Sequence, residues 1–177
     1  MLRSVGIVAL FVLAACNQTS TKVGSSPSPV IAQGNWNQNL TLSGDLPGHI
    51  TSIVPDQAGQ LTFCSGAKAR SGETWSDSFY ATVDASGNTW ELSIVIENFR
   101  GPGTYIDKDV KIALQSADKT QAWLSQDADP AQNLGVDKVT FIITRGQQSG
   151  TVDALLTNAT SGKRGAEHIT GNWNCRG

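Results

Sequence analysis

The sequence predicts an all-β domain, an antiparallel β-sandwich or barrel of about 8–11 short strands. Hydrophobic residues recur with period two in several segments, which is the pattern of strands with one buried face. Residues that favour turns (Gly, Asn, Asp, Ser and Pro) separate these segments about every eight to twelve positions. A composition of 39% hydrophobic and 16% charged residues with 18 glycines indicates a globular domain rich in turns.

The clearest strand is predicted at residues 90–97, where Trp90, Leu92 and Ile94 fall on one face. Residues 75–83 alternate in the same way. The chain between these two segments reads Asp-Ala-Ser-Gly-Asn, a run of turn-forming residues, so we expect the two strands to form a hairpin.

Other period-two segments predict strands at residues 39–43, 49–54, 60–64, 138–145 and 151–157. Residues 110–124 fit either alternating strands or a helical face. Their leading β-branched residues and the lack of a clear N-cap favour strands. The run Gly101-Pro102-Gly103 predicts a type II turn with positive φ at Gly103.

The first sixteen residues have the organisation of an export signal. Arg3 is followed by an apolar run over residues 5–13 that is roughly half the length of a membrane-spanning helix. The run ends in Leu13-Ala14-Ala15-Cys16, which resembles the lipobox of bacterial lipoproteins. This resemblance implies a lipid on the Cys16 sulfur and cleavage before Cys16, so that acyl chains anchor the protein to a membrane. An ordinary secretory signal that ends near a cysteine is the alternative.

Three regions are therefore expected: a signal peptide at residues 1–15, the lipidated cysteine with a flexible tether at 16–33, and a single β domain at 34–177. Asn17 follows the cysteine where an aspartate commonly retains such proteins on the inner membrane, which favours the outer membrane if the cell has one. The segments Gly-Asn-Trp-Asn-Cys and Gly-Pro-Gly-Thr-Tyr look like segments of uncharacterised β-rich bacterial lipoproteins, a resemblance that implies no particular activity.

The three cysteines have two different expected roles. If Cys16 carries lipid, Cys64 and Cys175 remain in an exported protein, where a disulfide is the expected state. Two buried free thiols are the alternative, and without matching histidines the pair does not predict a zinc site.

No catalytic motif stands out around the two histidines, His49 and His168. We expect both to be structural or surface residues. The acidic pair Asp107 and Asp109 lacks the glycine and glutamate of a calcium loop, and the same holds for residues 127 and 129. We therefore expect no metal and no cofactor.

Cleavage of residues 1–15 moves the formal net charge from −2 to −3, and a negative net charge does not favour nucleic-acid binding.

Five tryptophans are many for so polar a chain. Trp75 and Trp123 have polar neighbours in sequence and are predicted to face outward, where they could stack on a sugar. Trp36, Trp90 and Trp173 are predicted to pack in the core.

The predicted function is that of a lipid-anchored envelope protein whose β domain binds or displays an unidentified ligand and is not an enzyme. The partners expected are the membrane, through Cys16, and an envelope glycan or protein. A carbohydrate-binding module and a small secreted hydrolase are the alternatives, and the second requires a histidine, a carboxylate and a serine in one pocket.

Overall fold

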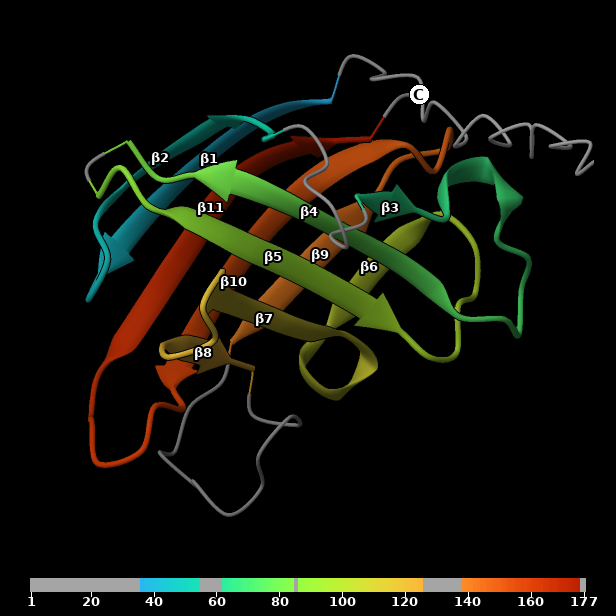
Figure 1. Ribbon diagram of the computed structural model, residues 1–177. Helices are drawn as coiled ribbons and strands as arrows, with labels where there is room; N and C mark the ends of the chain where they lie inside the picture. Colours follow the sequence, from blue (N-terminus) through green and yellow to red (C-terminus); the bar gives the residue numbers. More distant parts are fainter. Residues whose placement is uncertain (1–35, 55–61, 85, 126–137, 176–177) are drawn as a thin grey trace, which may run out of the picture. The chain divides into compact units, whose positions relative to one another are not determined.

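The computed structural model describes residues 36–54, 62–84, 86–125 and 138–175. The predicted signal, Cys16, the tether, and Asp127 and Asp129 lie outside these residues. The described chain forms eleven antiparallel strands and two short 3₁₀ helices, η1 (Gly66–Lys68) and η2 (Asp107–Asp109), which confirms the all-β prediction (Figure 1). None of its helices has the length and hydrophobicity to cross a bilayer.

In chain order the strands are β1 (Asn37–Gly44), β2 (Gly48–Ser52), β3 (Phe63–Cys64), β4 (Trp75–Thr82), β5 (Thr89–Ile96), β6 (Gly103–Ile106), β7 (Lys111–Ser116), β8 (Ala122–Leu124), β9 (Val139–Ile143), β10 (Ser149–Asn158) and β11 (Ala166–Asn174).

All eleven strands belong to one sheet. Its main hydrogen-bonded order is β2-β1-β11-β10-β8-β7-β5-β4-β3, and β9 pairs with β10 beside β8 while β6 pairs with β9. Strand β10 is therefore the branch point, because it pairs with β9 over its first half and with β8 at its end. The start of β1 at Asn37 and the end of β11 at Asn174 lie on neighbouring strands, since β1 pairs with β11.

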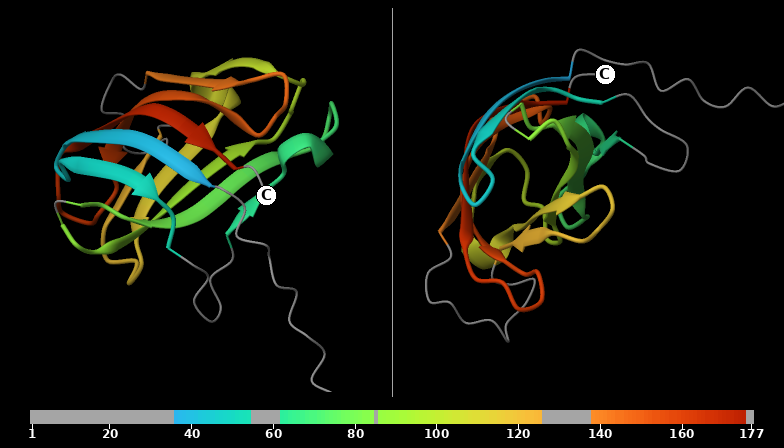
Figure 2. Two further views of the ribbon diagram at one scale, coloured as in Figure 1. Left: turned by 90° about the horizontal axis from the view of Figure 1, so that it is seen from above. Right: turned by 60° about the vertical axis from the view of Figure 1, so that its left-hand side comes forward.

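The sheet curls until its far strands meet. The Val54 amide donates to the Tyr80 carbonyl over 2.7 Å, and the Asp84 amide donates to the His49 carbonyl over 3.2 Å. These bonds join the β2 end of the sheet to β4. In the right-hand view of Figure 2 the colours accordingly run round a ring, from cyan β2 through red and orange to yellow and green.

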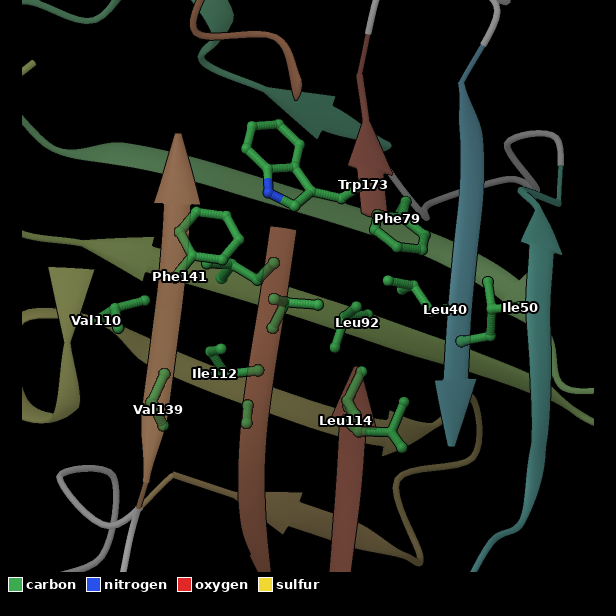
Figure 3. Packing of buried hydrophobic residues seen from close by; sticks show 14 of the residues in the cluster. Leu40, Ile50, Phe79, Leu92, Val110, Ile112, Leu114, Val139, Phe141 and Trp173 are labelled. Carbon is green, nitrogen blue, oxygen red and sulfur yellow. The ribbon is translucent and has the colours of Figure 1, made fainter. Parts of the chain in front are cut away.

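The inside of the curl is the hydrophobic core. Strands β4 and β5 alternate strictly between buried and partly exposed residues, so their period-two pattern marks one inward face. Figure 3 shows Leu92 of β5 among side chains from the strands opposite, with Phe141 and Trp173 close to each other. Trp36, Trp90 and Trp173 are buried, which confirms their predicted place in the core.

Gly150 in β10 allows a close approach that a larger residue would block. A Cβ at this position would lie 1.7 Å from the Ile142 carbonyl oxygen and 2.7 Å from Trp173 Nε1. The indole therefore reaches across Gly150 and donates to the Ile142 carbonyl over 3.2 Å. This bond satisfies the polar atom of a tryptophan that is otherwise packed among hydrophobic side chains.

Most strand predictions are confirmed, including the two strands β7 and β8 in the ambiguous segment 110–124. Strand β6 was not predicted, and it replaces part of the expected type II turn. The φ angle of Gly103 is positive as predicted, at 153°, and Gly101 also has a positive φ of 98°. The Gly101 carbonyl accepts from the Tyr105 hydroxyl over 2.6 Å, so a side chain stabilises this corner.

The predicted disulfide between Cys64 and Cys175 is present, with 6.2 Å between the two Cα atoms. Cys64 ends β3, the last strand of the main order, and Cys175 directly follows β11. The bond therefore crosses the curl and ties the C-terminal strand to the opposite side of the sheet.

We predict that Cys175→Ala lowers the free energy of unfolding of the oxidised protein by a few kcal/mol, below the roughly 4–5 kcal/mol that loop-closure entropy allows for this loop. Each kcal/mol shifts the melting temperature of such a domain by roughly 3–5 °C. Thermal unfolding with and without reductant measures the effect. Reductant should destabilise the wild type and leave the variant nearly unchanged, and an equal response from both would contradict the prediction.

Candidate functional site

The predicted outward orientation of Trp75 and Trp123 is wrong. Trp75 is 0% exposed and Trp123 is 3% exposed, so neither offers a free ring to a sugar. At Trp75 the physical reason is strand alternation, which points the adjacent Ser76 away from the core and the indole into it. Trp123 is instead inward on a strand whose same-parity polar neighbour, Ser125, is buried as well. Trp75 packs 5.5 Å from Phe141 and 5.3 Å from Trp173, measured between ring centroids.

His49 contributes to the closure of the curl and not to a catalytic group. Its backbone amide donates to Asp84 Oδ1 over 2.8 Å, and its carbonyl accepts from the Asp84 amide. Its Nδ1 lies 3.4 Å from the Thr41 hydroxyl on the neighbouring strand. These contacts support the structural role expected from the sequence.

His168 forms an exposed pair with Asp153, with 2.7 Å between Nε2 and Oδ1. Ser43 lies opposite His168 in the β1–β11 register, so a serine, a histidine and an aspartate share the outer face of three adjacent strands. Strand β11 pairs on both sides, and its backbone N–H groups are engaged in the sheet. A hydrolase also needs free donors for an oxyanion and a pocket for substrate. Because the β11 backbone is paired on both sides, it offers no free N–H group for an oxyanion beside His168.

The acidic pair at η2 is structural. Asp107 Oδ1 accepts from the Val139 amide over 3.1 Å, and Asp109 pairs with Arg100 over 2.9 Å. Within the described segments, no three His, Cys, Asp or Glu side chains are grouped so that they could hold a metal ion.

A hollow of about 360 Å³ opens at the end of the sheet where the β4–β5 turn meets the β7–β8 hairpin. This volume lies within the usual range of small-ligand pockets. The lining residues carry hydroxyl, amide and carboxylate groups around one indole: Asn88, Thr89, Trp90, Ser116, Ala117, Asp118, Thr120 and Gln121.

The β7–β8 hairpin is held in shape by Asp118. Its Oδ1 accepts from the Ser116 hydroxyl over 2.6 Å, from the Thr120 hydroxyl over 2.8 Å and from the Thr120 amide over 3.1 Å. These hydrogen bonds lower the pKa of Asp118 below its ordinary value, and the bond from Ser116 has the largest effect. The hairpin also joins β5, because the Ala117 amide donates to the Thr89 carbonyl. One wall of the hollow is thereby fixed in place.

Trp90 and Trp123 pack against each other beneath this end of the sheet, 5.4 Å apart between ring centroids. Trp90 Nε1 donates to the Ser86 hydroxyl, and Trp123 Nε1 donates to Asp45 Oδ2 over 2.9 Å. Asp45 lies in the β1–β2 turn, so the tryptophan pair is held from two different turns.

The same turn is fastened to β11 by Glu167, which is fully buried. Its Oε2 accepts from the Leu46 amide over 2.7 Å, while Oε1 has no partner. Burial is the main cause that raises the pKa of Glu167, and the nearby charge of Asp45 adds to it.

Asp77 in β4 is the most unusual side chain of the interior. It is 0% exposed, and no described residue bonds to either carboxylate oxygen. Burial without a compensating partner raises its pKa from 3.8 to about 8, so the carboxyl is protonated at neutral pH. Our sequence interpretation missed Asp77. The signal was present, because Asp77 has the same strand parity as the buried Trp75 and Phe79.

The hollow was missed as well, since residues 116–121 were treated as part of an ambiguous segment. An aspartate two positions before Thr120 is typical of an Asx turn and could have located the hairpin. The chain matches no family model, no curated protein and no solved structure. Its function therefore has to be argued from its own residues.

We predict that Asp77 makes the protein less stable as the pH rises. The unfolded carboxyl loses its proton near pH 3.8 and the folded one near pH 8. The contribution of this carboxyl to the free energy of unfolding is therefore fully present below pH 3.8. It falls by on the order of a few kcal/mol as the pH rises from 3.8 to about 8. Urea unfolding at a series of pH values should show a weaker fall for Asp77→Asn. The exposed Asp153→Asn is the control, and equal pH slopes for wild type and Asp77→Asn would refute the prediction.

Proposed function

We propose that this chain is an exported lipoprotein, anchored by lipid at Cys16, whose β domain binds a component of the cell envelope without transforming it. The observation that carries the proposal is the pairing of Cys64 with Cys175, which uses two of the three cysteines. Disulfides form and persist mainly in oxidising compartments outside the cytoplasm. The remaining cysteine is the one that the lipobox-like segment places at the cleavage site.

A binding role also fits the chemistry of the described surface. The two histidines are engaged at the outside of the sheet, and the hollow at its end contains no imidazole and no cation among its lining residues. A hydrolytic activity that survives purification and is lost in His49 or His168 variants would contradict this part of the proposal.

For the anchor, we predict that Cys16→Ser leaves the protein uncleaved or releases it from the membrane fraction. Intact-mass measurement of the wild-type membrane form should show that residues 1–15 are absent and that a lipid mass is added. As a matched control, Asn17→Ser should keep the lipid mass. An unmodified Cys16 thiol in the wild-type membrane fraction would rule out the anchor.

A carbohydrate-binding module is the second candidate, and the lining of the hollow favours it. Hydroxyl and amide groups such as those of Thr89, Asn88 and Gln121 match the hydroxyl groups of a neutral sugar. Asp118 adds one acceptor that is ionised at neutral pH because its hydrogen bonds lower its pKa. The ligand we expect is an uncharged envelope glycan, and the previously predicted Trp75 and Trp123 play no direct part in binding it.

We predict that the domain binds neutral oligosaccharides on a glycan array and that Asn88→Ala and Gln121→Ala each weaken binding about 2- to 10-fold, the effect of losing one hydrogen bond. Titration calorimetry with the selected glycan measures the change. Asn39→Ala, at an exposed position of β1, is the matched control and should bind like the wild type. An array with no neutral ligand, or unchanged affinity in both variants, would exclude the hollow as a glycan site.

A further inference from the structure

Asp77 and the disulfide meet on the inner side of the sheet. In the β3–β4 pair, Cys64 lies directly opposite Asp77. Directly opposed residues of antiparallel strands point to the same face with Cβ atoms about 4.5–5.5 Å apart. Because Cys64 is bonded to Cys175, Asp77 is the cross-strand neighbour of one of the two disulfide residues.

The surroundings of Asp77 contain no charged group in the described chain. Trp75 and Phe79 flank it on the same face of β4. Ile94 lies opposite it on β5, and Cys64 lies opposite it on β3. The aromatic rings that pack on Trp75 add no titratable group. The other buried acid of the described chain, Glu167, lies near the start of β11, at the opposite end of that strand from Trp173. Among the described residues that face Asp77, the cysteine pair is therefore the group whose sulfur could take its proton once the disulfide is broken.

The two sulfur-bearing residues differ in their exposure. Cys64 is partly exposed, whereas Cys175 is only 4% exposed. An external thiolate would therefore attack Cys64 Sγ and expel the thiolate of Cys175 into the protein interior. Disulfide exchange is faster when the leaving sulfur is stabilised, and an apolar site strongly disfavours a bare thiolate. A proton donor at this point would remove that obstacle.

We propose that Cys64 and Cys175 form a reversible dithiol–disulfide couple and that Asp77 is the acid that protonates the Cys175 sulfur when the bond breaks. The chemical partner is a dithiol reductant. The roles follow from the cross-strand position of Asp77 beside Cys64 and from the unequal exposure of the two cysteines.

One thiol of the reductant, as its thiolate, forms a bond to Cys64 Sγ, the Cys64–Cys175 bond breaks, and the Asp77 carboxyl gives its proton to the Cys175 thiolate. The second thiol of the reductant loses its proton, which restores the Asp77 carboxyl, and attacks the mixed disulfide. Cys64 leaves as a thiolate and takes a proton from solvent. The reductant is oxidised to a disulfide and the protein gains two thiols.

Reduction of the disulfide would remove one of the links that hold the curled sheet closed. The disulfide is the covalent link between β3 and the residue that follows β11, so its cleavage releases the C-terminal end from the far side of the sheet. The hydrogen bonds of β11 with β1 and β10 remain. The couple would therefore change this end of the domain without removing a strand from the sheet.

The test is the rate at which dithiothreitol reduces the native, oxidised protein, followed by alkylation of new thiols and mass measurement from about pH 6 to about pH 9. Each rate is divided by the thiolate concentration of the reagent. Above about pH 8 the protonated fraction of Asp77 falls about tenfold per pH unit, and the corrected wild-type rate should fall with it. Asp77→Asn, which preserves shape, should be at least about tenfold slower near pH 7 and independent of pH. Asp153→Asn should behave like the wild type.

Two results for the wild-type protein would overturn the proposal, and one for the Asp77→Asn variant would do so as well. One is a corrected wild-type rate that does not fall at high pH, a measurement that needs no variant. The other is a rate that does not depend on dithiothreitol concentration, which would mean that the disulfide reacts only after the domain unfolds. Melting temperatures of the oxidised variants establish that Asp77→Asn is folded. If it is folded and its pH profile matches that of the wild type, Asp77 is not the acid.

Discussion

A single sheet with no helix or second sheet to cover it has to bury its hydrophobic face against itself, and this constraint governs the described domain. The inward residues of β4 and β5 become buried only when the sheet curls far enough to bring β2 to β4. A flat arrangement would leave a row of large side chains in water, at roughly 1.5–3 kcal/mol for each. The short hydrogen bond from Val54 to Tyr80 and the disulfide from Cys64 to Cys175 close the curl at different points.

The interior produced in this way contains two carboxyl groups in different circumstances. Glu167 lies beneath a turn and accepts a backbone hydrogen bond, so its burial helps to hold the β1–β2 connection. Asp77 makes no such bond with any described residue. A buried polar group without a partner costs free energy, and its retention calls for a role that packing does not supply. The position of Asp77 opposite Cys64 suggests such a role, because disulfide exchange at a buried sulfur needs a proton donor.

The polar hollow follows from the same architecture. The middle of the curled sheet is filled with hydrophobic side chains, which leaves the end of the sheet as the place where polar residues can gather. There the tilted ring pair of Trp90 and Trp123 gives two turns a firm base, and Asp118 fixes the hairpin beside it. The residues that give the sheet its rigidity and those that line the hollow are therefore neighbours, and Trp90 belongs to both groups.

The sequence by itself determined the all-β class, most strand positions and the cysteine pair. These depend on local period-two patterns and on the exclusion of Cys16 from pairing. Only the tertiary structure decided that Trp75 and Trp123 point inward, since the buried face of a strand is set by its neighbours and not by the polarity of adjacent residues. Likewise, nothing local places Asp77 opposite Cys64. Strand register joins residues distant in sequence, and register is a property of the closed sheet.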